Sequence, residues 1–83
     1  MAEFRVKVYW LSDSGKRYPY KNCEVRAGDG NYGMSQTTWC DENGVAIVRG
    51  ASDYYRTLYL NGKVADTGRF EDGGMYGPYS IPG

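Results

Sequence analysis

The chain has 83 residues, the length of one small domain, and its 10 basic and 10 acidic residues leave no net charge. A neutral balance disfavours nucleic-acid binding, which usually leaves a basic footprint. The longest apolar run, residues 45–48, is too short to span a bilayer, and no segment has the apolar core of a signal peptide. We therefore expect one domain over residues 1–83, without a membrane span and cytoplasmic by default.

The composition and the first apolar pattern favour β structure. Nine tyrosines, two tryptophans and two phenylalanines suit pleated sheets, and twelve glycines suit tight turns. Residues 4–11 alternate with period two, which places Phe4, Val6, Val8 and Trp10 on one face of a strand.

Two further strands are expected before residue 41. Residues 12–20 read as a loop, because Ser-Asp-Ser-Gly is turn chemistry and Pro19 cannot donate to a ladder. Residues 22–27 alternate again, and residues 34–40 carry the β-branched and aromatic residues of a strand. The glycine-rich segment 28–33 between them is a loop or hairpin tip.

The second half of the chain carries two hairpin signals, Asn43-Gly44 and Asn61-Gly62, both typical of type I′ turns. They separate expected strands at residues 45–50, 54–60 and 63–70. In residues 54–60, alternation groups Tyr54, Arg56, Leu58 and Leu60 on one face and Tyr55, Thr57 and Tyr59 on the other.

A loop over residues 71–77 precedes a last short strand, residues 78–83. Pro78 and Pro82 confine that strand to an edge or a terminus. Six to seven short strands joined by glycine turns predict an all-β fold: one small antiparallel β-sandwich of Ig-like or prealbumin-like type, without substantial helix.

Three stretches occur in an informative order: GKRYPYKNCEV at 15–25, TTWCDENGVAIV at 37–48 and LYLNGK at 58–63. This order resembles the prealbumin-like (transthyretin-like) sandwich of carboxypeptidase regulatory-like domains over residues 4–63. That family has a Thr-Thr-Asp-x-x-Gly-x-Ala turn between two central strands; here Trp39 and Cys40 separate the threonines from the aspartate. The resemblance implies that Thr37, Trp39 and Gly44 are structural, with Trp39 filling the core or covering an edge.

Catalytic and metal chemistry have little support. Ser-His-Asp and Cys-His arrangements need a base with a pKa near neutrality, and the chain has no histidine. Two cysteines do not complete a zinc site, and the run Asp41 to Asn43 lacks the spacing of a calcium loop. We expect no enzyme activity, no cofactor and no metal.

Two interpretations of Cys23 and Cys40 are open. They are either free buried thiols or a disulfide between neighbouring strands. A chain without a signal peptide is expected in a reducing compartment, which favours free thiols.

The tyrosines are the candidate binding residues, since tyrosine offers rigid, amphipathic contact area to proteins and stacks on sugars. The candidate set is Tyr54, Tyr55, Tyr59, Tyr32, Tyr76 and Tyr79. The alternative is that these side chains only cover sheet edges.

Two functions follow from these observations. The first is a non-catalytic binding or interaction module that presents tyrosine-rich loops and strand faces to a protein or glycan. The second is a structural or assembly protein, such as a small phage or cell-surface component, that forms a homo-oligomer through sheet edges. Nucleic-acid binding is a third and weaker hypothesis. It would combine aromatic stacking with contacts from the basic residues Arg5, Lys7, Lys16, Arg17 and Lys21.

Overall fold

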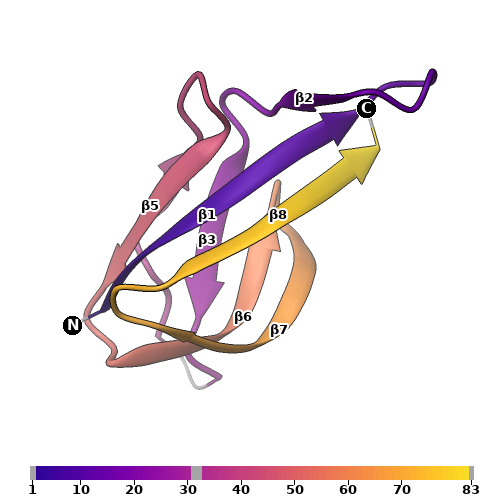
Figure 1. Cartoon of the computed structure of the whole chain (residues 1–83). Helices are drawn as coiled ribbons and strands as arrows, with labels where there is room; N and C mark the ends of the chain where they lie inside the picture. Colours follow the sequence, from indigo (N-terminus) through magenta and orange to yellow (C-terminus); the bar gives the residue numbers. More distant parts are fainter. Residues whose placement is uncertain (1, 31–32, 83) are drawn as a thin grey trace.

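The computed structural model describes residues 2–30 and 33–82, which form strands and turns without a helix. Eight strands build two sheets that pack around one shared core (Figure 1). The all-β expectation is confirmed. The strand count differs from six to seven, because the segment expected to be a loop at 12–20 contains a short strand.

The first sheet is organised around β1 (Ala2–Leu11). One edge of β1 pairs antiparallel with β5 (Val45–Gly50) in its first half and with β2 (Arg17–Pro19) in its second half; the other edge pairs with β8 (Met75–Pro82). The β1–β8 pair is parallel. The expectation of a purely antiparallel sandwich is therefore wrong for this pair. The last strand also starts earlier than residue 78, and it lies at a sheet edge as its prolines predicted.

The second sheet has the strand order β4-β3-β6-β7 and is antiparallel throughout. Its strands are β4 (Thr38–Trp39), β3 (Glu24–Gly28), β6 (Tyr54–Leu60) and β7 (Lys63–Glu71). The strand expected over residues 34–40 shrinks to β4. The reason is that the Ser35 N–H donates to Ala27 in this sheet while the Gln36 N–H donates to Arg49 in the other, so the segment crosses between sheets.

The core combines apolar side chains from both sheets. Its largest members are Tyr55, Phe4, Leu58, Val6, Val8, Val25 and Val48. Tyr55 and Leu58 are three residues apart, so strict alternation would place them on opposite faces. Both are buried because the β6–β7 ladder shifts register between Tyr55 and Thr57. The predicted division into two faces therefore holds for residues 57–60 and is wrong for residues 54–56.

The two expected type I′ turns have different outcomes. Asn61 and Gly62 both have positive φ, 53° and 81°, as a type I′ turn requires. At the other turn only Gly44 has positive φ, 75°. There Asp41 accepts hydrogen bonds from the backbone N–H groups of Asn43 and Val45, at 2.8 and 3.1 Å, and the type I′ prediction is wrong.

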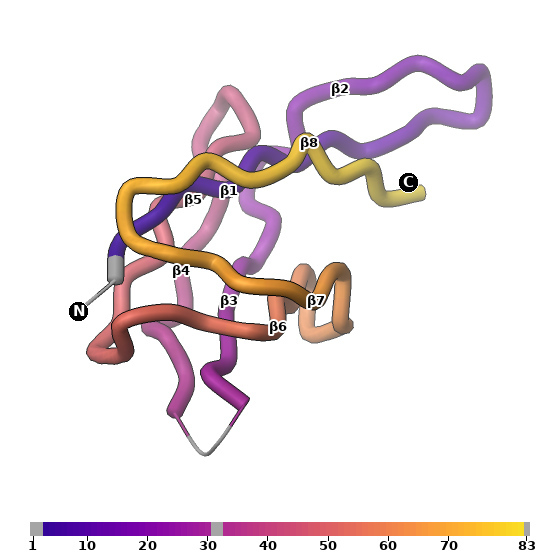
Figure 2. The backbone as a smooth tube through the Cα atoms, turned by 60° about the horizontal axis from the view of Figure 1, so that its bottom comes forward, coloured from indigo at the N-terminus to yellow at the C-terminus, as the bar shows by residue number. Residues whose placement is uncertain are grey.

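The β1–β2 hairpin and the end of β8 project beyond the rest of the molecule, as Figure 2 shows. The chain is correspondingly elongated, with principal extents of 39 × 20 × 17 Å. Inner-face side chains near this end of the first sheet therefore lie where the second sheet no longer covers them fully.

Candidate binding surface

Trp10 continues the buried face of β1, yet it is only half-buried. Its cross-strand partners are Tyr18 on β2 and Ile81 on β8, so the three side chains form a row on the inner face of the first sheet. The Trp10 and Tyr18 rings stack at a centroid distance of 4.8 Å, and Tyr18 is 42 % exposed. This row is an apolar floor that reaches past the core.

A crossover from β2 to β3 forms one wall beside this floor. Pro19 ends β2, Tyr20 packs against the core, and Lys21 and Asn22 turn the chain toward β3, with Asn22 at a φ of 64°. Trp10, Pro19, Tyr20 and Lys21 enclose a hollow of about 370 Å³. We call the surface made by Trp10, Tyr18, Pro19, Tyr20, Lys21 and Ile81 the aromatic ledge.

A second hollow, of about 240 Å³, opens beside Ile81. It lies between the edges of β7 and β8, and its lining is mainly apolar. The lining residues are Leu60, Lys63, Val64, Ala65, Tyr79, Ser80 and Ile81. Trp10 lines the first hollow and its cross-strand neighbour Ile81 lines the second, and each hollow has one lysine in its lining.

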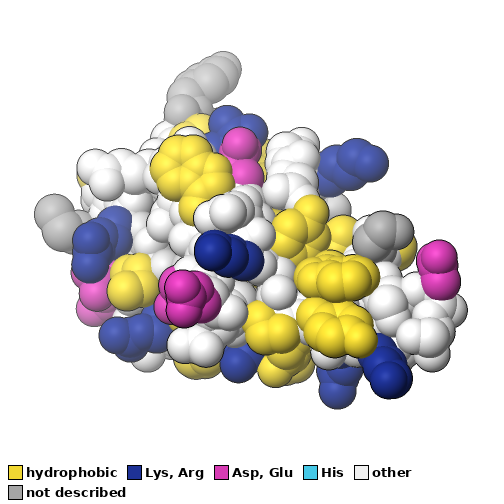
Figure 3. All heavy atoms as spheres, turned by 90° about the horizontal axis from the view of Figure 1, so that it is seen from above, with side chains coloured by type: hydrophobic (Ala, Val, Ile, Leu, Met, Phe, Trp, Pro, Cys, Tyr) yellow, Lys and Arg dark blue, Asp and Glu magenta, His cyan; other side chains and the backbone are white. Residues whose placement is uncertain are grey.

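Hydrophobic and basic side chains meet at this end of the molecule. The view from above in Figure 3 shows yellow side chains gathered over the β1–β2 end, with Lys or Arg side chains next to them. On the outer face of β1, Lys7 and Arg17 lie over the Tyr9 ring, at 5.3 and 5.4 Å from its centroid. The outer face of this sheet, on the side away from the ledge, is therefore also cationic and aromatic.

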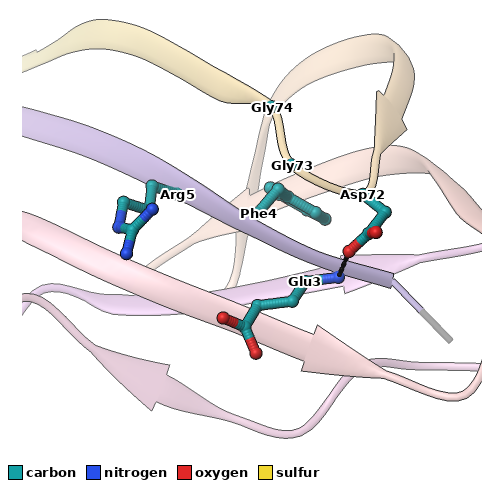
Figure 4. A pocket seen from close by; sticks show the side chains of 6 residues that line it. All are labelled: Glu3, Phe4, Arg5, Asp72, Gly73 and Gly74. Atoms are coloured by element: carbon teal, nitrogen blue, oxygen red, sulfur yellow. Dashed lines mark hydrogen bonds between the residues drawn. The ribbon is translucent and has the colours of Figure 1, made fainter.

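A hollow of about 380 Å³ at the opposite end of β1 has a structural explanation (Figure 4). The Asp72 carboxylate accepts a hydrogen bond from the Glu3 N–H at 2.9 Å, and the Glu3 carboxylate pairs with Arg49. The backbone N–H groups of Arg5 and Gly73 bond to the carbonyls of Gly74 and Glu3. These contacts fix the loop between β7 and β8 on β1, and both carboxylates of the hollow are engaged in them.

The structure places Tyr55 in the core, with 1 % of its surface exposed, so its predicted role in surface binding is wrong. The register shift in β6 is the physical reason. Tyr32 lies outside the described residues.

Tyr76 and Tyr79 on β8 point inward rather than outward. The Tyr76 ring meets Phe4 and Phe70 edge-on, at centroid distances of 5.4 and 4.9 Å. The Tyr79 hydroxyl donates to Asp66 at 2.8 Å. Burial, followed by the bond to Asp66, raises the pKa of Tyr79. Both tyrosines join the two sheets.

Tyr54 and Tyr59 on β6 are half-buried and do not share a surface with the β8 tyrosines. The Arg69 and Arg56 guanidinium groups lie 4.3 and 5.5 Å from the Tyr54 ring centroid, and Arg56 also donates to its hydroxyl. These arginines lie over the Tyr54 ring, which a binding partner would otherwise contact. The predicted tyrosine set is thus not brought together.

The sequence reading missed the ledge itself. The sequence predicts a loop for the segment that contains Tyr18 and Tyr20, and for Trp10 it indicates only the apolar face of a strand. A signal was present, because Ser12 and Gly15 hold the turn positions of a short hairpin. That hairpin places Tyr18 opposite Trp10.

Gly44 and Trp39, both expected to be structural, differ in the structure: Gly44 is packed against its neighbours, whereas Trp39 is exposed. Gly44 packs against the Val8 carbonyl and the backbone of Pro19 and Tyr20, where a Cβ would not fit. Trp39 is 57 % exposed on β4, so it does not fill the core as one reading expected.

Cys23 and Cys40 are free and buried in the structure. They lie side by side, since the Cys40 N–H donates to the Cys23 carbonyl at 2.9 Å. The contact with the Cys23 thiol, together with burial, raises the pKa of Cys40, and the same contact lowers that of Cys23. The pair is packed as small core residues.

Residues 2–30 and 33–82 contain no group of three metal-ligating side chains, and no helix among them is long and apolar enough to cross a membrane. Comparison with protein-family models, with curated proteins and with solved structures finds no match for this chain. The geometry of the ledge is therefore the basis for a functional proposal.

Proposed function

We propose that this protein is a non-catalytic protein-interaction module that binds its partner on the aromatic ledge. The observation that carries the proposal is the row formed by Tyr18, Trp10 and Ile81, an apolar floor on an inner sheet face that the second sheet leaves partly open. Aromatic side chains with one accessible side are the residues that dominate protein interfaces. The two hollows beside the row offer places for partner side chains.

The sheet edges support a module over the alternative of assembly through strand pairing. The ladder between β6 and β7 has two register shifts, which bend the free edge of β7. That edge also carries the charged residues Lys63, Asp66, Arg69 and Glu71. Charges and bulges are devices that discourage edge pairing.

Three of the four remaining described edges are also poor templates for a second chain; the fourth, β5, has six residues and no proline, and on its outer side the Gln36 N–H bonds to the Arg49 carbonyl. β8 contains Pro78 and Pro82, which cannot donate to a ladder. β2 has three residues and ends in Pro19, and β4 has two residues. Short and proline-containing edges leave few backbone groups for pairing.

The hydrogen bonds around the ledge favour a polypeptide over a neutral glycan. Sugar recognition needs amide, carboxylate or hydroxyl groups that are free to bond sugar hydroxyls. The Asn61 amide instead donates to the Tyr20 hydroxyl and accepts from the Glu24 N–H, at 2.9 and 3.1 Å. Tyr79 and Asp66 bond to each other. The groups left are apolar surface, the two lysines and the hydroxyls of Tyr18 and Ser80, with no side-chain amide or carboxylate among the residues of the ledge.

Selection from a random-peptide display library on the immobilised protein tests this function. We expect enrichment that is lost in Trp10→Ala and retained in Trp39→Ala, which removes an exposed tryptophan on a different strand. Circular dichroism of both variants reports whether the fold is intact. Enrichment that survives Trp10→Ala and Tyr18→Ala in folded protein, or no enrichment at all, would contradict the proposal.

We also propose that the fold is of the prealbumin-like kind found in carboxypeptidase regulatory-like domains. Its support is the all-β arrangement in two sheets and the Asp41–Gly44 turn, which leads from β4 in one sheet to β5 in the other. Intermediate sequences that connect this chain to that family, with a glycine aligned to Gly44, would support the relationship. A chain of relatives that leads to a different fold would contradict it.

A further inference from the structure

We propose that the partner of the aromatic ledge is an acidic, extended polypeptide segment that places apolar side chains in the two hollows. This inference rests on the proposed function and adds the chemistry of the partner. It starts from the distribution of charge around the ledge.

The described cations fall into two groups by their ionic contacts. Arg26, Arg49 and Arg69 form ion pairs with glutamates of the chain itself. Others, such as Arg5, Lys7 and Lys16, form no ion pair with a described residue. Lys21 and Lys63, which line the two hollows, belong to this second group. Their ammonium groups are therefore available to the carboxylates of a partner, and such complementary charges raise association rates and select partners.

The carboxylates of this region are engaged or lie at its margin. Asp66 accepts hydrogen bonds from the Tyr79 hydroxyl and from the Thr67 N–H, both at 2.8 Å. Asp13 is in the exposed turn of the β1–β2 hairpin. Glu42, exposed in the turn beside the Pro19–Tyr20 backbone, is the exception among the carboxylates near the ledge, and Lys21 and Lys63 together favour an acidic partner over a basic one.

The dimensions of the floor fit an extended chain. Tyr18, Trp10 and Ile81 lie on three adjacent strands, which are about 4.8 Å apart, so the row is roughly 10 Å long. An extended chain advances about 3.3 Å per residue and crosses this distance in about three residues. Side chains on both sides of the crossing would reach the two hollows, and acidic residues at its ends would meet Lys21 and Lys63.

The peptides selected on the immobilised protein provide the first test. We expect apolar or aromatic residues flanked by Asp and Glu. Synthetic copies in which Lys replaces each Asp or Glu should bind at least about tenfold more weakly, a loss of about 1.4 kcal/mol. Selected peptides that depend on Trp10 but carry no acidic residues would overturn this inference and leave the proposed function standing.

Charge-reversed protein variants provide the second test. The Lys21→Glu/Lys63→Glu protein should lose about tenfold or more in affinity for the acidic peptides, measured by fluorescence anisotropy. Arg5→Glu/Lys7→Glu is the control matched in charge, because Arg5 and Lys7 lie on the outer face of the same sheet, and its effect should stay within about twofold. Equal losses in both variants would mean non-specific attraction and overturn the inference.

Heparin, an anionic polysaccharide, tests the remaining alternative, which is that the ledge binds anionic glycans rather than a polypeptide. We expect heparin to bind weakly and without dependence on Trp10. Heparin that displaces the selected peptides and requires Trp10 for binding would assign the ledge to anionic glycans and overturn the polypeptide assignment.

Discussion

The side-chain amide of Asn61 donates a hydrogen bond of 2.9 Å to the hydroxyl of Tyr20. This bond connects the β6–β7 turn of one sheet to the crossover that leaves the other sheet. The same amide accepts the Glu24 N–H, so one side chain links three segments beside the ledge.

Removal of this bond should lower stability, and the loss should grow with the number of hydrogen bonds that a substitution deletes. Tyr20→Phe deletes one hydrogen bond and should lower the free energy of unfolding by about 0.5–1.5 kcal/mol. Asn61→Ala also deletes the Glu24 bond and a residue suited to positive φ, and should cost about 1–3 kcal/mol. Urea denaturation of both single variants and the double variant measures the coupling; fully additive losses would mean that the bond contributes nothing.

Gly44 should be far less tolerant of substitution than Gly15. Both glycines close turns of the same hydrogen-bond pattern and have similar φ, 75° and 85°. A Cβ at Gly15 meets no atom within 4 Å, whereas at Gly44 it meets the Val8 carbonyl and the Pro19–Tyr20 backbone. Gly15→Ala should cost about 1–2 kcal/mol through φ alone, and Gly44→Ala about 3 kcal/mol or more. Equal thermal denaturation of the two variants would show that the contact at Gly44 is unimportant.

Tyr55 and Tyr59 should respond differently to truncation, although they are neighbours on β6. Tyr55→Ala removes a fully buried ring and should cost about 3–5 kcal/mol, much of the stability of a small domain. Tyr59→Ala removes a half-buried ring at the surface and should cost about 1 kcal/mol. The comparison uses guanidinium denaturation, and a small effect at Tyr55 would contradict the register shift in β6.

Tyr79 should make the protein less stable in alkali. Its folded-state pKa is raised, so the folded protein keeps the proton where the unfolded chain has lost it. That contribution is fully present below about pH 10, the ordinary pKa of tyrosine, and is lost as the pH rises further. Tyr79→Phe should flatten the decline of the denaturation midpoint between about pH 9 and pH 12. An unchanged decline would assign it to other groups.

The native mass in solution should remain close to the chain mass of 9.3 kDa from micromolar to near-millimolar concentration. The reason is that the free edges of β2, β4, β7 and β8 are short, bulged, charged or interrupted by proline. Light scattering after size exclusion measures this mass. A stable multiple would favour the assembly function instead.

Alternation was a reliable guide where the ladder is regular. Residues 45–50 and 54–60 have the predicted bounds in β5 and β6, and the even positions of β1 face the core as expected. Alternation did not predict the burial of Tyr55, because the register shift there arises from pairing with β7 and cannot be detected in the sequence of β6 alone.

The ledge needed information that local patterns do not contain. The Ser12–Gly15 turn shares its hydrogen-bond pattern with Asp41–Gly44, so the hairpin could have been inferred from an oxygen-bearing side chain three residues before a glycine. Pro19 obscured it by suggesting a loop. The partial exposure of Trp10 depends on where the second sheet ends, which is a property of the packed molecule.

The parallel pairing of β1 and β8 has a mechanical consequence. Because the first and last strands lie side by side and run in the same direction, residues 2 and 82 are at opposite ends of the molecule (Figure 1). Tension applied between these ends would pull the two strands lengthwise past each other and load their cross-strand hydrogen bonds together rather than one after another. A chain of this design should resist stretching better than one whose terminal strands peel apart, and single-molecule pulling would measure the difference.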